Sequence, residues 1–156
     1  MVGIPEMYQT AACATLVIFL KLFVSNGRWG MAKGNAGLRA KEDMNNATGA
    51  VSEDLVEKAT HLGRIISNDI ENIPIGLVVV WSSLLTIVAA APMLLLDFET
   101  YAIVHMIFTI CWICFRVAHT VMYEMRLGVP RSVVFVLSTC CLFGLMILSV
   151  VAAFNM

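Results

Sequence analysis

Four long apolar stretches, separated by short polar connections, set the pattern along the chain. Each contains about 18 to 24 mainly apolar residues, enough for an α-helix to cross a hydrocarbon layer ~30 Å thick. The pattern predicts an all-α integral membrane protein, a bundle of four transmembrane helices forming a single domain over residues 1–156. The expected helices cover about 7–33, 52–96, 101–124 and 131–153, with a loop at about 34–51.

The second expected helix begins before the membrane does. Ser52 followed by Glu53 and Asp54 is typical of an N-cap with an acidic first turn. The continuous apolar run starts only at Ile73. We therefore expect the first part of this helix to project into water.

The basic residues predict the orientation in the membrane. The N-terminus, the connection between the second and third helices and the C-terminal tail carry no basic residue. The connections after the first and third helices carry Arg28, Lys33, Arg39, Lys41, Lys58, Arg126 and Arg131. The positive-inside rule then places both basic connections in the cytosol and both termini across the membrane. The expected membrane is the endoplasmic reticulum for a eukaryotic source and the inner membrane for a bacterial one.

Composition narrows the function classes further. The chain is 60% hydrophobic and 13% charged, with a mean hydropathy of +0.85, which is too apolar for a soluble domain of this size. The net charge of −1 gives no basic field for nucleic acid. All five cysteines lie within apolar runs, which argues against a disulfide framework and against a metal site.

Polar residues stand where the second helix should turn apolar. At ~100° per residue, Arg64, Asn68, Glu71 and Ile75 share one face, and Asp69 points elsewhere. Polar groups beside hydrocarbon are costly unless they face a bundle interior or a wet cavity. We therefore expect the face of Arg64 to look inward.

The other helices bring polar residues to the same depth. Arg116, His119 and Tyr123 form a stripe near the end of the third helix, and Arg131 and Ser132 open the fourth. Three arginines there face two acids, of which only Glu71 is expected inward. The positive surplus suits an anionic, water-soluble molecule that meets a lipophilic one from the membrane.

Simpler interpretations of the same residues stay open. Arg64 or Arg116 could form a structural ion pair with Glu71. His119 could be a hydrogen-bonded interior group. Tyr123 could belong to an interfacial aromatic belt.

Three motifs in combination resemble the MAPEG family (membrane-associated proteins in eicosanoid and glutathione metabolism). They are Arg64-x3-Asn68-Asp69-x-Glu71-Asn72, Arg116-Val-Ala-His119-Thr-Val-Met-Tyr123 and Pro130-Arg131-Ser132. The nearest branch is similar to microsomal glutathione transferase type 1 and microsomal prostaglandin E synthase. The second and third motifs lean toward the synthase, and the first leans toward the transferase.

The resemblance implies a homotrimer of four-helix subunits, with glutathione bound between neighbouring subunits near the cytosolic face. Arg131 would stabilise the thiolate. The residues expected to hold or line glutathione are Arg64, Asn68, Glu71, Arg116, His119 and Tyr123. A fixed cation would lower the thiol pKa from ~8.5 and so raise the nucleophilic fraction.

Some positions depart from the family pattern. The arginine expected at the end of the first helix corresponds to Lys33, with Arg28 as a rival. Ser132 and Asp43 match catalytic candidates of the synthase, although the simpler interpretation of Asp43 is a solvated loop acid. The segment 25–63 contains no cysteine, so activation by thiol modification is not expected.

Three functions remain. The first is a membrane glutathione transferase or peroxidase acting on lipophilic electrophiles or lipid hydroperoxides. The second is a glutathione-dependent isomerase of the prostaglandin E synthase type. The third is a non-catalytic, lipid-binding membrane scaffold. The first two imply glutathione and a lipophilic small molecule as partners, besides membrane lipid and the chain itself.

Overall fold

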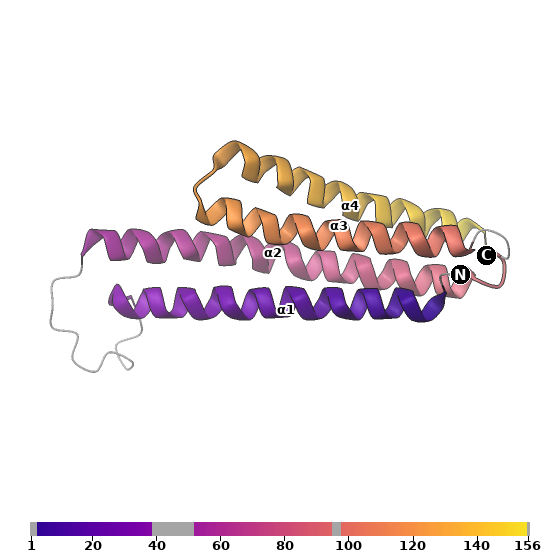
Figure 1. Ribbon diagram of the computed structural model, residues 1–156, viewed down its shortest axis with the longest axis horizontal. Helices are drawn as coiled ribbons and strands as arrows, with labels where there is room; N and C mark the ends of the chain where they lie inside the picture. Colours follow the sequence, from indigo (N-terminus) through magenta and orange to yellow (C-terminus); the bar gives the residue numbers. More distant parts are fainter. Residues whose placement is uncertain (1–2, 39–51, 95–97, 156) are drawn as a thin grey trace.

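Four helices build the computed structural model, which describes residues 3–38, 52–94 and 98–155 (Figure 1). They are α1 (Ile4–Asn35), α2 (Glu53–Ala90), α3 (Phe98–Glu124) and α4 (Gly128–Phe154), and these described residues include no strand. Each helix is long and apolar enough to cross a membrane. The predicted fold class, an all-α bundle of four membrane-spanning helices, is confirmed.

The observed helices differ from the expected ones mainly at their ends. α3 and α4 each begin three residues earlier than expected, and α2 begins at Glu53 after an extended Ser52. The expected end of the second helix near residue 96 is wrong, since α2 ends at Ala90 and a turn follows. Pro92 explains the early stop, because it has no N–H to continue the helix.

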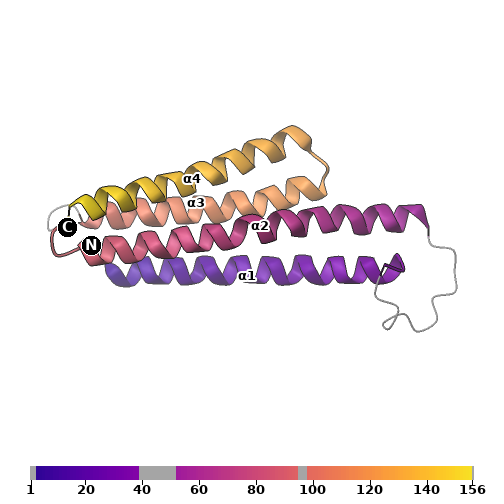
Figure 2. The same ribbon diagram turned by 180° about the vertical axis from the view of Figure 1, so that it is seen from behind.

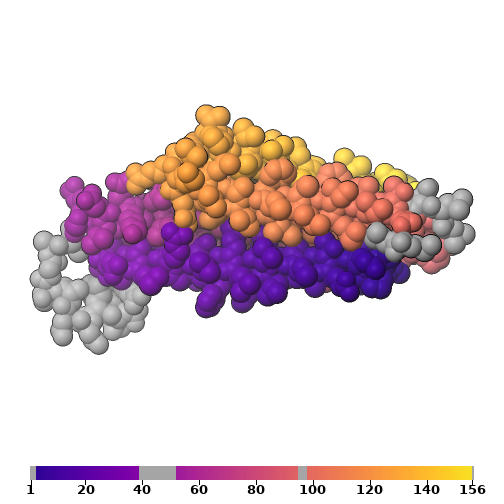
Figure 3. Space-filling model, viewed as in Figure 1, coloured from indigo at the N-terminus to yellow at the C-terminus, as the bar shows by residue number. Residues whose placement is uncertain are grey.

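The helices run antiparallel in chain order. α1 and α3 end, and α2 and α4 begin, at one end of the bundle, which we call the basic end (Figures 1 and 2). The N- and C-termini lie together at the opposite end. α1 and α4 each pack against α2 and α3 but not against one another. The first turns of α2 project past the ends of α3 and α4 (Figure 3).

The centre of the bundle is packed closely enough to require a glycine. A Cβ at Gly76 of α2 would lie 2.1 Å from Cζ2 of Trp112 on α3, so only glycine lets the indole sit there. Trp112 and His105 of α3 are buried, and His105 Nε2 donates to the carbonyl of Val80 at 3.2 Å. Large apolar side chains such as Phe23 and Phe143 are exposed on the outside, as membrane-embedded helices require.

Candidate functional site

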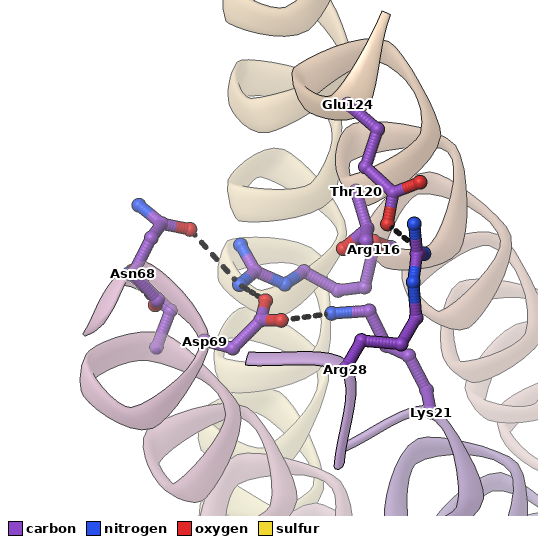
Figure 4. A network of polar contacts seen from close by, with 8 residues as sticks. Lys21, Arg28, Asn68, Asp69, Arg116, Thr120 and Glu124 are labelled. Carbon is purple, nitrogen blue, oxygen red and sulfur yellow. Dashed lines mark hydrogen bonds and ion pairs between the residues drawn. The ribbon is translucent and has the colours of Figure 1, made fainter. Parts of the chain in front are cut away.

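A buried ion network joins three helices near the basic end. Asp69 of α2 is fully buried and accepts hydrogen bonds through both carboxylate oxygens (Figure 4). Its Oδ2 pairs with Lys21 Nζ of α1, and its Oδ1 lies 3.1 Å from Arg116 Nη2 of α3. Lys21 and Arg116 have side chains only 9% and 2% exposed. The network therefore places three charges inside the bundle.

The position of Asp69 corrects the expectation from the sequence. Asp69 faces inward, whereas Arg64 and Glu71 are exposed on the surface of the single subunit. The buried stripe of α2 runs through Ile65, Asp69, Ile73 and on to Gly76, with the spacing of one helix face. The polar face predicted to look into the bundle is thus the outer face of α2, and the acid beside the cations is Asp69.

The ion pairs left open by the sequence are not formed. Arg116 pairs with Asp69 and not with Glu71. Glu71 accepts a hydrogen bond from Ser67 Oγ at 3.2 Å. Within the described parts of the chain, Arg64 makes no ion pair. Arg64 and Glu71 are therefore both available to a ligand or to a neighbouring subunit.

Asn68 connects the buried network to this outer face. The half-buried Asn68 accepts a hydrogen bond at Oδ1 from Arg116 Nη2, 3.2 Å away. Its backbone carbonyl accepts a second one from Asn72 Nδ2 at 2.7 Å. One nitrogen of Arg116 thus bonds both Asp69 and Asn68.

An open groove lies over the outer face of α2. Its volume is about 520 Å³. Trp29 of α1 closes one side, and the polar lining consists of Thr60, Arg64, Ser67 and Glu71. Lys33 Nζ lies 3.8 Å from the centre of the Trp29 ring, which places a further cation beside the groove.

A second cluster surrounds Tyr123 at the basic end. The guanidinium carbon of Arg131 lies 4.3 Å above the Tyr123 ring, a cation–π contact that orients the arginine. His119 meets the same ring edge-on, with ring centres 5.8 Å apart. His61 of α2 packs at 5.4 Å and donates from Nε2 to the backbone carbonyl of Tyr123 at 3.1 Å.

The remaining candidates lie apart from these groups. Ser132 is exposed and donates to the carbonyl of Gly128 at 3.1 Å, a bond within the first turn of α4. Arg28 pairs with Glu124 across the basic end. Asp43 lies outside the described residues. Of the two helix-one cations, Lys33 contacts Trp29, which lines the groove, whereas Arg28 is paired with Glu124.

Besides Asp69, sequence reasoning missed two further residues of these clusters, Lys21 and His61. Lys21 was recognisable only as a lone cation within an apolar run, and His61 only as a polar residue one turn before Arg64. Neither signal names a partner, because partners on other helices depend on how the helices are staggered.

Comparison with known protein families identifies the family of this chain. The model of the MAPEG family matches residues 9–151, nearly the whole chain. The chain belongs to the MAPEG family. No individually curated protein and no solved structure matches it. MAPEG proteins generally use glutathione as a cosubstrate, and the family contains glutathione transferases and related enzymes as well as non-catalytic members.

Membership of the MAPEG family also agrees with the four membrane-spanning helices of this chain. The matched region contains the greater part of all four helices, and a MAPEG protein is a four-helix membrane bundle. The outer face of α2, the groove above it and the Tyr123 cluster lie within the matched residues. The family match therefore covers both the groove with Arg64 and Glu71 and the cluster with Arg131.

Proposed function

We propose that this MAPEG protein is a membrane-bound glutathione transferase and peroxidase. It joins the glutathione thiolate to lipophilic electrophiles or reduces lipid hydroperoxides. The observation that carries the proposal is the exposed face of α2, where Arg64 and Glu71 stand without an ionic partner among the described residues beside Asn68. Arginine suits a carboxylate of the tripeptide, glutamate its ammonium, and asparagine its amides.

Arg131 supplies the chemistry. The guanidinium keeps its charge and is oriented by the ring of Tyr123, so it offers the thiol sulfur a fixed cation. The thiolate then attacks the electrophilic carbon, an S–C bond forms and the leaving group departs with its electron pair. With a hydroperoxide, two glutathiones yield the disulfide, the alcohol and water. The protein contributes binding, orientation and ionisation of the thiol.

The complete site needs more than one subunit in this proposal. Within one subunit no hydrogen bond, ion pair or ring contact of the described residues joins Arg131 to Arg64, Asn68 or Glu71. A homotrimer, with the outer face of α2 packed against a neighbour, would enclose the open groove. Glutathione would then bind between subunits near the cytosolic face, in the endoplasmic reticulum of a eukaryote or the inner membrane of a bacterium.

A smaller cavity offers a place for the lipophilic substrate. It has a volume of about 210 Å³ and lies between α2, α3 and α4. Its polar lining lies nearer the basic end than its apolar lining, which includes Leu142 and Met146. The polar lining residues are Asn72, Arg116, Ser138 and Thr139. An apolar chain would therefore point toward the middle of the bundle, with its polar group near Asn72 and Arg116.

Filling this cavity should weaken the second substrate alone. We expect Leu142→Trp to raise the KM for a lipophilic electrophile about tenfold, as loss of ~1.4 kcal/mol of binding implies, and to leave the KM for glutathione unchanged. Leu137→Trp is the control, because Leu137 is exposed on α4 and is not among the cavity residues. Equal KM values in both variants would remove this cavity from the substrate path.

Arg64 should contribute to glutathione affinity. A hydrogen bond to a charged group contributes ~1.5–3 kcal/mol, so Arg64→Ala should raise the KM for glutathione about 10- to 100-fold with a small change in kcat. Arg126→Ala is the matched control, since Arg126 is an exposed arginine at the basic end paired with Glu57 at 2.7 Å. An unchanged KM would show that Arg64 lies outside the site.

The isomerase remains the second candidate, and the run from Arg116 to Tyr123 with Arg131-Ser132 favours it. Purified protein incubated with glutathione and an endoperoxide or a generic electrophile separates the two. A stable thioether or glutathione disulfide supports the proposed transferase, whereas unconsumed glutathione with a rearranged lipid supports the isomerase. A protein that fails to bind glutathione at millimolar concentration would be a non-catalytic scaffold.

A further inference from the structure

The buried network and the outer face of α2 meet at a single side chain, Asn68. We propose that Arg116, clamped by Asp69 and Lys21, is a positioning residue that holds the Asn68 amide with its NH₂ group turned toward the ligand. The inference rests on the proposed glutathione site, and it makes the buried network part of that site.

The clamp begins at Asp69. Each of its carboxylate oxygens is held by a different helix, Oδ2 by Lys21 of α1 and Oδ1 by Arg116 of α3. A fully buried carboxylate with both oxygens bonded has one rotamer. Arg116 is therefore anchored at a fixed point on α2, although it originates from α3.

Arg116 in turn fixes the orientation of the Asn68 side chain. Its Nη2 lies 3.1 Å from Asp69 Oδ1 and 3.2 Å from Asn68 Oδ1. A guanidinium nitrogen can only donate, so the amide must present its oxygen to Arg116 and cannot flip. Figure 4 shows the result: the oxygen of Asn68 points to Arg116, and its nitrogen points away from the network.

The orientation selects the chemistry of the ligand group. Asn68 is half-buried and lies about one helical turn from Arg64 and from Glu71, both of which line the groove. An NH₂ group held outward is a donor only, so it fits a carbonyl or carboxylate oxygen of a peptide. A freely rotating amide would have to be ordered on binding, and ordering one such side chain reduces affinity about three- to tenfold.

The network also has more charge than pairing requires. Two buried cations face one carboxylate, and Arg116 Nε has no hydrogen-bond partner within the structure described. A purely structural pair would need only one cation, since every extra buried charge is costly. Lys21 occupies Oδ2 of Asp69, which leaves Oδ1 for Arg116.

A double-mutant cycle tests the connection. The full-length protein, purified in detergent, would be compared as wild type, Asn68→Ala, Arg116→Lys and the double variant, by the Kd for glutathione and by KM and kcat. Lysine keeps the charge at Asp69 but lacks the planar fork that reaches two acceptors. We expect Arg116→Lys to raise the Kd about tenfold alone and to change it less than twofold when Asn68 is already alanine.

Two further variants keep the test decisive. Thr109→Val changes a buried polar residue of α3 outside the network and should leave the Kd unchanged. If Arg116→Lys does not fold, Asn68→Asp serves instead, because it keeps an oxygen for Arg116 and replaces the outward NH₂ by an acceptor. We expect its Kd to exceed that of Asn68→Ala.

The outcomes separate this inference from the proposed function. If Arg116→Lys raises the Kd for glutathione by the same factor in the wild type and in Asn68→Ala, then Arg116 acts independently of Asn68. That result would overturn the inference but not the proposed function. So would a wild-type Kd in Arg116→Lys or in Asn68→Asp. A wild-type protein that does not bind glutathione would overturn the proposed function and the inference together.

Discussion

Replacing Arg131 by alanine should lower kcat at neutral pH about 30-fold while the Kd for glutathione changes less than threefold. A free thiol with a pKa of ~8.5 is only about 3% ionised at pH 7. Full ionisation beside a fixed cation would therefore raise the thiolate fraction, and with it the rate, about 30-fold. Arg131 is oriented over Tyr123 at 4.3 Å and is proposed to be that cation. Steady-state rates and a direct binding titration check both halves of the prediction.

The pH profile separates ionisation from other effects of the substitution. Without the cation, the rate of Arg131→Ala should rise about tenfold per pH unit toward the pKa of the free thiol, ~8.5, whereas the wild-type rate should be level there. Arg131→Lys keeps a charge but loses the guanidinium that contacts the Tyr123 ring, so its rate should fall between the two. A parallel pH profile in all three proteins would contradict the assigned role.

Replacing Asp69 by alanine should cause the largest loss of stability in the chain, about 3–5 kcal/mol in the free energy of unfolding. The substitution leaves the buried cations Lys21 and Arg116 without a counter-charge. Thermal or denaturant unfolding of the purified protein in detergent would measure it. Glu57→Ala is the control, because Glu57 is exposed and its pair with Arg126 contributes at most ~1 kcal/mol.

A compensated variant distinguishes buried charge from lost packing. If the uncompensated cations cause the loss, then Lys21→Met and Arg116→Met added to Asp69→Ala should restore most of the stability, as apolar replacements of buried ion pairs do. Glutathione affinity should not recover, because Asn68 would have no donor to hold it. A triple variant as unstable as Asp69→Ala would show that the loss comes from packing.

The membrane spans were predictable because apolar length alone sets them. α1, α3 and α4 lie within a few residues of the expected ranges. The early end of α2 had a visible signal, Pro92, which a count of apolar residues does not weigh. The family was also within reach, since its motifs are specific in combination and the family match covers residues 9–151.

The direction in which polar side chains point was not predictable in the same way. α2 carries polar residues on two faces, one with Asp69 and one with Arg64 and Glu71. The rule that polar groups avoid lipid holds for both faces, but it does not say whether a face meets the bundle or a neighbouring subunit. The sequence-based prediction turned the face with Arg64 and Glu71 into the bundle because it carries more charged residues, and it therefore placed Asp69 outside, whereas Asp69 is buried.

The partners of the buried charges were beyond the sequence for a related reason. Lys21, Asp69 and Arg116 come from three helices, and their meeting depends on the stagger of α1, α2 and α3. Helical periodicity relates residues within one helix only. Asp43, the loop acid of the synthase resemblance, stays a prediction because it lies outside the described residues.

A titration of the detergent-purified protein with glutathione at neutral pH, followed by the ultraviolet absorbance of the thiolate, tests the central claim most directly. We predict a saturable rise in thiolate absorbance for the wild type, and saturable binding without that rise for Arg131→Ala. A wild-type protein that binds no glutathione, or binds it with the thiol still protonated, would contradict the claim that the basic end of this bundle captures and ionises the tripeptide.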